Sequence, residues 1–380
     1  MHRNLAPLCL LLLGFFMNNI ASADDAEGQL VFVSAFAAGD DGAIQAYMLD
    51  TATGKLTPAE RTAGIEHPFF MALSPDRKYL YSIHAPGVFS GENDEFVAAF
   101  ALEGGGGKLK LLNKVSSRGK ASCYLDVDQT GKTVLVANYT SGSVAALPVA
   151  ADGSLGEAKS FIQHAGSSVD KTRQGEPHAH SIVVSPDNRF VFSADLGLDQ
   201  ILNYQLEPAT AKLSPNRQPF ARAIPGAGPR HFTFHPNGQH AYAINEMHNS
   251  VTLFDYDTET GVLLEQQTLS TLPADFDGTS YCADLKITPD GKFLYGTNRG
   301  HDSIAAYRLD ENGRLKLLDI IPSLGAGPQN LAIAAGGKLL LCANMPGNNV
   351  AVFQIDPKTG GLTPLGEPVN ITSPSCIMLK

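Results

Sequence analysis

The sequence predicts an all-β fold, a seven-bladed β-propeller whose blades each contain four strands. A sevenfold repeat of about fifty residues, strand-type patterning within each repeat and the absence of helical periodicity support this prediction. The clearest repeats begin at Phe234 and Ile287, where turn motifs such as Pro-Asn-Gly and Pro-Asp-Gly separate short strand-like segments. Strands at this repeat length favour a ring of blades that bury their faces against one another.

The second and third strands of the repeats give the count of seven. The last residues of the second strands lie 46 to 57 positions apart, at Ala35, His84, Asn138, Asp195, Asn245, Asn298 and Asn344. The third strands follow at 43–49, 96–102, 143–149, 200–206, 250–256, 303–309 and 349–355. Two independent sets of strands therefore indicate seven blades.

The first strands predict how the ring closes. Six of them precede a second strand and start near His67, Ala121, Pro177, Gly228, Ser280 and Gly327. The seventh is the last segment of the chain, 373–380, whereas the N-terminal run QLVFVSA has no first strand before it. We expect 373–380 to join the N-terminal strands in one blade, which closes the ring and removes exposed sheet edges at the seam.

The first 23 residues have the pattern of a cleaved signal peptide. Arg3 precedes an apolar run over 5–20 and the small-x-small sequence Ala21-Ser22-Ala23, which signal peptidase cleaves. The run is short for a spanning helix, so an uncleaved membrane anchor is the less favoured alternative. We expect a mature chain of residues 24–380 that folds as one propeller domain and is periplasmic or secreted.

Composition argues against several classes of partner. Cleavage removes Arg3 and changes the formal net charge from −10 to −11. We expect neither nucleic acid nor an anionic membrane as a partner, because phosphate binding requires clustered lysine and arginine. The cysteines of 24–380 lack metal-ligand spacing, so we expect buried free thiols and no metal or cofactor, with a Cys342–Cys376 bridge as the alternative.

Repeat alignment separates residues that build every blade from residues that occur once. One ring of equivalent positions, on the innermost strands, contains Phe69, Cys123, His180, Arg230, Ala283 and Gln329. A second ring, just after the second strands, contains Ala85, Tyr139, Leu196, Glu246, Arg299 and Met345. Because consecutive strands are antiparallel, both rings lie at the same face. We therefore expect His180, Arg230, Glu246 and Arg299 to meet at one mouth of the central channel.

The longest connections, 84–95, 164–177 and 272–280, are expected at the same mouth, where loops held by a scaffold often carry function. Lys171 and Arg173 are interpreted as a solvated face rather than an anion site, as are Asp275 and Asp277. The remaining histidines near the mouth, His248 and His301, share one repeat register and are interpreted as turn residues.

One imidazole, one carboxylate and two guanidiniums suit acid/base chemistry beside an anion. Arginine binds carboxylate or phosphate through a flat fork of donors, and a second arginine can stabilise charge on a carbonyl oxygen. Histidine and glutamate can transfer a proton near neutral pH. With no G-x-S-x-G motif in the chain, attack of activated water on an ester-like carbonyl is favoured. The alternative is a set of structural salt bridges that fill the channel.

Three stretches resemble one known family. GPRHFTFHPNG, YAINE and TPDGKFLYGTNRGHDSIAAYRL are similar to the seven-bladed propeller lactonases, which include bacterial 6-phosphogluconolactonase and the fungal carboxymuconate lactonizing enzyme. The resemblance implies an active site of His180, Glu246, Arg230 and Arg299, in which the two arginines also bind substrate. His178, two residues from His180 on the same side of a strand, is a further candidate for substrate binding.

The resemblance implies a lactone hydrolase that opens a small anionic lactone. Because the expected leader directs the protein away from cytosolic phosphosugars, a sugar lactone without phosphate and a lactone bearing a carboxylate both remain open. One alternative is the reverse reaction, a lactone-forming cyclase of the carboxymuconate type. Another is a non-catalytic exported propeller used as a binding platform.

Overall fold

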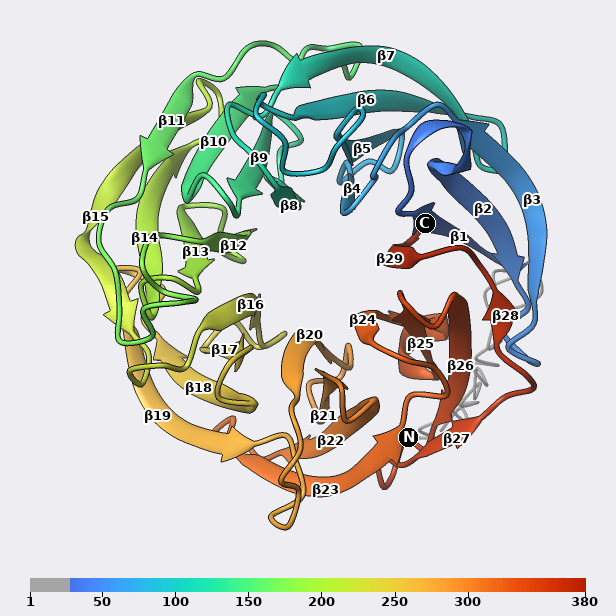
Figure 1. Ribbon diagram of the computed structural model, residues 1–380, viewed down its shortest axis with the longest axis vertical. Helices are drawn as coiled ribbons and strands as arrows, with labels where there is room; N and C mark the ends of the chain where they lie inside the picture. The colour runs from blue at the N-terminus through green and yellow to red at the C-terminus, as the bar shows by residue number, and fades with distance from the viewer. Residues whose placement is uncertain (1–27) are drawn as a thin grey trace, which may run out of the picture.

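Seven antiparallel sheets form a ring around a central axis (Figure 1). The computed structural model describes residues 28–380, so the predicted signal peptide and its cleavage site lie outside the described residues. Two short 3-10 helices, Gly39–Asp41 and Ala335–Gly337, interrupt an otherwise all-β chain in this range. The seven-bladed fold expected from the repeats is confirmed.

Each blade runs from the axis outwards in strand order, and the strands of the first four blades are as follows. They are β29 (Pro374–Leu379), β1 (Gln29–Ala35), β2 (Ala43–Leu49) and β3 (Leu56–Ala63); β4 (Met71–Leu73), β5 (Tyr79–His84), β6 (Phe96–Glu103) and β7 (Lys108–Ser116); β8 (Ser122–Val127), β9 (Thr133–Asn138), β10 (Ser143–Pro148) and β11 (Ser160–Gln163); β12 (Ala179–Val184), β13 (Phe190–Asp195), β14 (Gln200–Glu207) and β15 (Lys212–Arg222).

The last three blades follow the same order, except that the outer strand of the seventh is split in two. They contain β16 (Pro229–Phe234), β17 (His240–Asn245), β18 (Ser250–Tyr256) and β19 (Leu263–Ser270); β20 (Tyr281–Ile287), β21 (Phe293–Arg299), β22 (Ser303–Leu309) and β23 (Leu315–Pro322); β24 (Pro328–Ala334), β25 (Leu339–Asn344), β26 (Asn349–Ile355), β27 (Leu362–Pro364) and β28 (Val369–Asn370).

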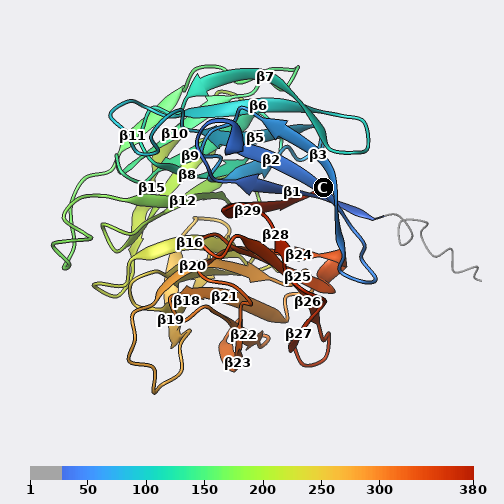
Figure 2. The same ribbon diagram turned by 45° about the vertical axis from the view of Figure 1, so that its right-hand side comes forward.

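The C-terminal strand closes the ring as expected. β29 pairs antiparallel with β1, with Val31 opposite Leu379 and Val33 opposite Ile377. Figure 2 shows the two strands side by side at the seam. The second strands also end where the repeats predict, except β21, which continues one residue further to Arg299.

The innermost strand of the second blade is shorter than expected. β4 begins at Met71 rather than near His67. His67 has a positive φ of 44°, and Pro68 has no N–H to donate to a sheet ladder. The chain therefore enters the strand only after this turn.

The hydrophobic core lies between neighbouring blades. Second strands such as β9 and β25 are buried at every residue, whereas the outer strand β3 is mostly exposed. Tyr81, Tyr242 and Tyr295 each donate a hydrogen bond to a glycine carbonyl in the next blade, at 3.2, 2.6 and 2.9 Å. These bonds fix each blade against its neighbour.

The four cysteines of residues 28–380 are buried and free, so the alternative Cys342–Cys376 bridge is not formed.

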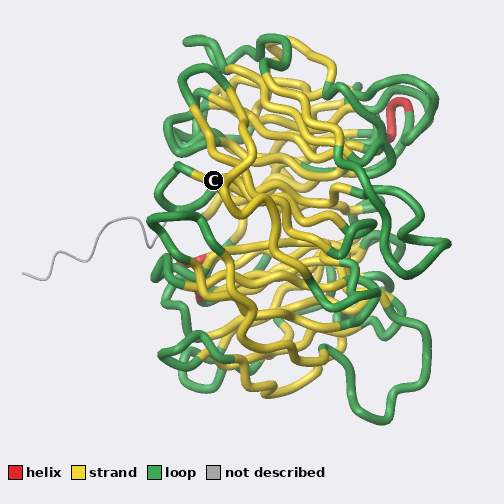
Figure 3. The backbone as a smooth tube through the Cα atoms, turned by 90° about the vertical axis from the view of Figure 1, so that its left-hand side faces the viewer, coloured by secondary structure: helices red, strands yellow, loops and turns green. Residues whose placement is uncertain are grey.

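No helix in the same range is long and apolar enough to cross a membrane. Figure 3 shows the strands running between two loop-covered faces, with longer loops on one of them.

Candidate active site

A β-bulge on the innermost strand of four blades turns one side chain out of the sheet. In β12, Ala179 pairs with Asp195 and Ser181 pairs with Ala194, so His180 has no partner on the second strand. The same shift in the other three blades frees Cys123, Arg230 and Gln329. Bulges re-aim side chains in this way, and all four residues line one cavity. The ring that the repeats predict is therefore built by a repeated local irregularity.

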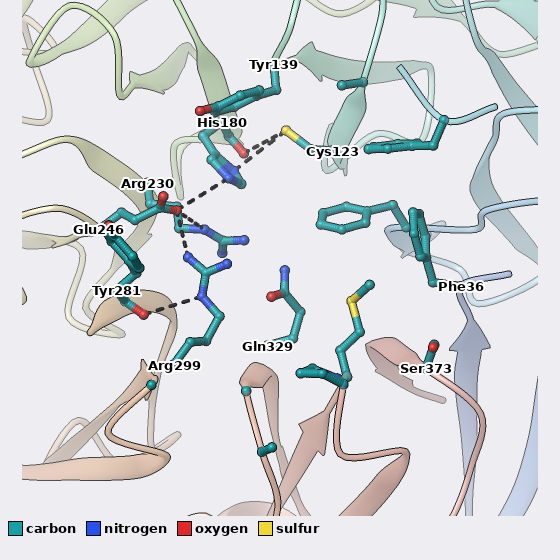
Figure 4. A pocket seen from close by; sticks show the side chains of 18 of the residues that line it. Phe36, Cys123, Tyr139, His180, Arg230, Glu246, Tyr281, Arg299, Gln329 and Ser373 are labelled. Carbon is teal, nitrogen blue, oxygen red and sulfur yellow. Dashed lines mark hydrogen bonds and ion pairs between the residues drawn. The ribbon is translucent and has the colours of Figure 1, made fainter. Parts of the chain in front are cut away.

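The cavity has a volume of about 1020 Å³ and opens at one mouth of the channel. Its wall also includes Tyr139, Glu246 and Arg299 (Figure 4), which follow or end the second strands. Met345, which follows β25, lines it too. Three predicted ring members do not line it, because Ala85, Leu196 and Ala283 are buried in the blades. Most of both rings thus meets at one face, as the antiparallel order of the strands requires.

Glu246 is the centre of the polar cluster. Its Oε2 accepts hydrogen bonds from Arg230 Nε at 3.0 Å and Arg299 Nη2 at 2.8 Å. The Nε2 atom of His180 lies 4.0 Å from the same oxygen. The structure thus brings together the four residues singled out from the sequence, which come from three successive blades.

A third guanidinium belongs to this cluster, and here the interpretation from the sequence was wrong. Arg173 donates to Glu246 Oε1 at 2.6 Å and to the Tyr139 hydroxyl at 3.3 Å. Its loop is tied down by Gln174, whose buried amide donates to Leu196 O and Asp199 Oδ1 at 2.9 and 2.7 Å. The neighbouring Lys171 is exposed. The sequence did hold one indication of this role for Arg173, because its loop, 164–177, is expected at the same mouth of the channel.

The charge states follow from burial and from the arginines. Burial disfavours a charged Glu246, but Arg299, Arg230 and Arg173 outweigh it and lower the carboxyl pKa. Burial lowers the pKa of His180 well below its ordinary value, and Arg230 lowers it further. At neutral pH the site therefore holds an ionised carboxylate and a neutral imidazole.

The other charged side chain on the cavity wall, Asp302, is paired with backbone groups next to it. Asp302 accepts the backbone N–H groups of Gly300 and Gly327 at 3.1 and 2.8 Å. Within residues 28–380 no group of three or more His, Cys, Asp or Glu side chains is arranged to hold a metal ion. Three guanidiniums around one carboxylate leave local positive charge in an otherwise acidic protein.

A buried hydrogen-bond chain behind the cavity fixes Arg230. Its Nη1 lies 3.1 Å from His231 Nε2, and His231 Nδ1 lies 2.8 Å from Asp284 Oδ1. Lys286 and Asn330 donate to Asp284 at 2.7 to 2.8 Å. Burial and Arg230 lower the pKa of His231 to about 4, so the ring is neutral, donates from Nδ1 and accepts from Arg230 at Nε2. Repeat alignment missed His231 and Asp284, which lie in or beside bulges.

Each central arginine keeps donors for a ligand. Arg299 donates from Nη2 to Glu246 and to Cys282 O at 2.9 Å, and Arg230 uses Nε and Nη1. Arg230 Nη2 and Arg299 Nη1 have no hydrogen-bond partner among the described residues. Two fixed amino groups are therefore left to bind an anion or a carbonyl oxygen.

His178 is placed differently from its expected role. It lies just before β12, stacks on Tyr139 with ring centroids 4.5 Å apart, and its Nδ1 is 3.1 Å from Tyr139 O. It is not part of the cavity wall, whereas His180 is. His178 therefore packs against Tyr139 rather than lining the cavity, and its expected substrate contact stays a prediction.

The two turn histidines lie as interpreted from the sequence. His248 and His301 hydrogen-bond Ser250 and Ser303 at 3.0 and 2.7 Å, each two residues further along the chain. Neither is part of the cavity wall. Asp275 and Asp277 are exposed, in agreement with a solvated loop.

Comparison with known proteins identifies the family of the chain. The family model described as "Lactonase, 7-bladed beta-propeller" matches residues 30–379. A 6-phosphogluconolactonase of Bacillus subtilis is 33% identical over 347 residues, which cover 91% of this chain and 97% of that protein. A 6-phosphogluconolactonase of Formosa agariphila is 32% identical over 355 residues, which cover 92% and 99%. The solved structure of a periplasmic gluconolactonase from Pseudomonas aeruginosa matches with a TM-score of 0.87 at 30% identity, covering 92% of this chain and 98% of that one. The chain belongs to the seven-bladed β-propeller lactonase family.

Proposed function

We propose that this protein hydrolyses a small lactone, either a sugar lactone or a lactone bearing a carboxylate, held by a pair of arginines. The observation that carries the proposal is the convergence of two guanidiniums, an ionised carboxylate and a neutral imidazole on one cavity, with the Arg173 guanidinium paired to the same carboxylate. Relatives named 6-phosphogluconolactonase and gluconolactonase support this class of reaction.

Arg230 and Arg299 form the anion clamp. Glu246 holds both guanidiniums in place. The free Arg230 Nη2 and Arg299 Nη1 groups bind the lactone carbonyl oxygen and, in a lactone that bears a carboxylate, that carboxylate. Donors that are fixed before the reaction stabilise the negative charge that develops on that oxygen without reorganising. Positive charge at the mouth also attracts an anionic substrate to an otherwise acidic protein.

His180 is the proposed base. A water oxygen attacks the lactone carbonyl carbon while the neutral imidazole accepts a proton from that water. The resulting oxyanion collapses, the ring carbon–oxygen bond breaks, and the leaving alkoxide takes the proton back from His180. The product is an open-chain hydroxy acid. Glu246, 4.0 Å from His180 Nε2, stabilises the transient imidazolium, while its pairing with the arginines makes it a weaker base.

We further propose that the protein acts outside the cytosol. The leader-like sequence of residues 1–23 supports export, and one structural relative is described as periplasmic. N-terminal sequencing of protein purified from the periplasm or the medium tests this directly. A first residue of Asp24 is expected, and a chain retained in the cytosol with Met1 intact would contradict export.

Proton release from a panel of lactones tests the hydrolase assignment. The panel includes gluconolactone, 6-phosphogluconolactone and a carboxylated butenolide, and muconates are added in a separate assay for lactone formation. Hydrolysis that Arg299→Ala abolishes supports the proposal, with Arg217→Ala on the exposed face of β15 as the matched control. Turnover of muconates alone would favour the cyclase, and no turnover with either class would favour a binding platform.

A further inference from the structure

The wall of the cavity opposite the arginines is aromatic. Phe36, Phe69 and Phe89 line it, and Figure 4 shows Phe36 across the cavity from Arg230 and Arg299. The Phe36 ring centroid lies 5.4 Å from that of Phe69 and 5.1 Å from that of Phe89. All three side chains are partly exposed rather than buried in the core. One cavity thus has a charged side and an apolar side.

This aromatic wall is part of the built site. Phe69 occupies the ring position that carries His180 and Arg230 in later blades, so its side chain is aimed at the same space. Phe36 follows β1, where the chain leaves the blade. The wall therefore comes from the first two blades, at the far side of the channel from the polar cluster.

Phe89 is held in place by the loop that carries it. The buried carboxylate of Glu95 accepts the backbone N–H groups of Ser90, Ala121 and Ser122 at 2.8, 3.0 and 2.7 Å. The hydroxyls of Ser90 and Thr140 lie 2.7 Å apart. The loop is thus tied to the neighbouring blade directly beside Phe89, and the aromatic wall is formed before any ligand binds.

The shape of the wall indicates what fits against it. Phe36 meets Phe69 and Phe89 at interplanar angles of 80° and 84°, so the rings form a corner rather than a flat platform. A flat platform suits the face of a sugar ring, whereas a corner encloses a substituent that projects from a ring. Phenylalanine also offers no hydrogen bond to a hydroxyl. A volume of about 1020 Å³ leaves room for more than one lactone ring.

We infer that the site is built for amphipathic lactones, in which a carboxylate-bearing ring bound by Arg230 and Arg299 also carries an alkyl or aryl substituent that packs in the corner of Phe36, Phe69 and Phe89. This inference rests on the proposed lactonase function and narrows its substrate class. The substituent gains free energy by covering aromatic surface that water otherwise contacts. The arginines fix the orientation of the ring, so substituent and carbonyl occupy opposite sides of the cavity.

A homologous series of carboxylate-bearing δ-lactones with alkyl substituents of increasing length tests the inference. Each methylene that reaches the aromatic corner should raise kcat/KM by roughly fourfold, the equivalent of burying one methylene. Phe89 lies outside any strand, and in Phe89→Ala the rise in kcat/KM per methylene should be at least twofold smaller. Phe161→Ala, a partly exposed ring on the outer strand β11, should leave it unchanged. Melting temperatures of all variants show whether each is folded.

A binding measurement separates this inference from the proposed reaction. Calorimetry compares the affinities of the protein for 3-phenylpropanoate and propanoate. Neither acid is a lactone, so the measurement does not depend on turnover. Binding of the aryl acid at least tenfold tighter, lost in Phe89→Ala, supports the aromatic subsite even if no lactone is hydrolysed. Equal affinities for the two acids, or lactone hydrolysis with no dependence on substituent length, overturn the inference and leave the hydrolase intact. A preference for gluconolactone over every substituted lactone would also overturn it.

Discussion

The two walls of the cavity are made from the same repeat, but they have opposite chemistry. In the fourth and fifth blades the inner ring position carries His180 and Arg230, whereas in the second blade it carries Phe69. The polar wall is a hydrogen-bonded network centred on Glu246, and the apolar wall is a corner of three phenylalanines. A repeated backbone therefore supplies positions, and the side chains that differ between blades supply function.

The walls also differ in how their residues are supported. Behind the polar wall, His231 and Asp284 continue the network into the channel, so Arg230 is fixed from two sides. In the aromatic wall, Phe89 depends on one loop that is tied down through Glu95. We expect changes in the polar wall to act on the chemical step and changes in the aromatic wall to act on substrate selection.

The largest expected effect is that of His180→Gln. Loss of a positioned base should lower kcat by roughly 10²–10⁴-fold. Because the pKa of His180 lies well below its ordinary value, wild-type kcat/KM should be flat through neutral pH and fall in acid as the imidazole becomes protonated. The variant should lose that acid limb. His178→Gln is the comparison, and we expect at most a few-fold change because His178 lies behind Tyr139. Equal losses of kcat in the two variants would contradict the assignment of His180, rather than His178, as the base.

Arg230→Ala should have the next largest effect. Removing a fixed donor to the developing oxyanion costs about 10²–10³-fold in kcat. Arg230→Lys keeps the charge but loses the fork of donors, so its activity should stay well below that of the wild type. Steady-state kinetics with Arg217→Ala as the matched control measure this effect. Unchanged turnover in a folded Arg230→Ala protein would show that the polar wall is structural.

Asp284→Asn tests the support behind the polar wall. It removes a buried charge that is paired with His231 and Lys286, and should lower the free energy of unfolding by about 3 kcal/mol at pH 7. Asp290→Asn, whose partner is exposed Lys292, should cost less than about 1 kcal/mol. Urea unfolding measures both. Equal costs would mean that the buried pair adds nothing to stability beyond what a surface pair adds.

The same variant predicts a change with pH. Burial opposes ionisation of Asp284, but Lys286 and His231 lower its pKa, and the pKa of His231 is lowered to about 4. Both groups bind fewer protons in the folded state, so their contribution to stability is present at neutral pH and is lost as pH falls. For His231 the loss begins below about pH 6.5 and continues to about pH 4. Asp284 itself takes up protons at lower pH, below its ordinary pKa of 3.8. Asp284→Asn should therefore make the decline below about pH 4 shallower, and an unchanged slope there would contradict this.

The smallest expected effect is that of Arg173→Ala. Arg173 contacts Glu246 from the loop and is one-third exposed, so solvent screens its contribution. We expect kcat/KM to fall roughly five- to tenfold, mostly through KM. Lys171→Ala, two residues away and exposed, is the control on the same loop. A loss with Lys171→Ala as large as that with Arg173→Ala would indicate a general charge effect rather than a defined contact.

Periodicity made the blades and four site residues predictable. The strands recur in one register, so the seam at β29 and the convergence of His180, Arg230, Glu246 and Arg299 follow from counting positions. Their catalytic roles, like the single mature domain, stay predictions.

The remaining features break the repeat and could not be counted. The bulges add unpaired residues, which brings His231 beside Arg230 although neighbours on a regular strand point to opposite faces. Arg173 and Phe89 lie on loops outside the repeat, where conformation depends on contacts distant in sequence, such as those of Gln174 and Glu95.

A crystal structure with a bound hydroxy acid, the product of lactone opening, tests whether the two arginines hold the reacting carbonyl group. We expect the product carboxylate to contact both Arg230 Nη2 and Arg299 Nη1, with its carboxyl carbon facing His180 across a space that one water can occupy. A hydroxy acid bound outside this cavity at saturating concentration, or bound within it without contact to either arginine, would show that the arginines do not bind the reacting group.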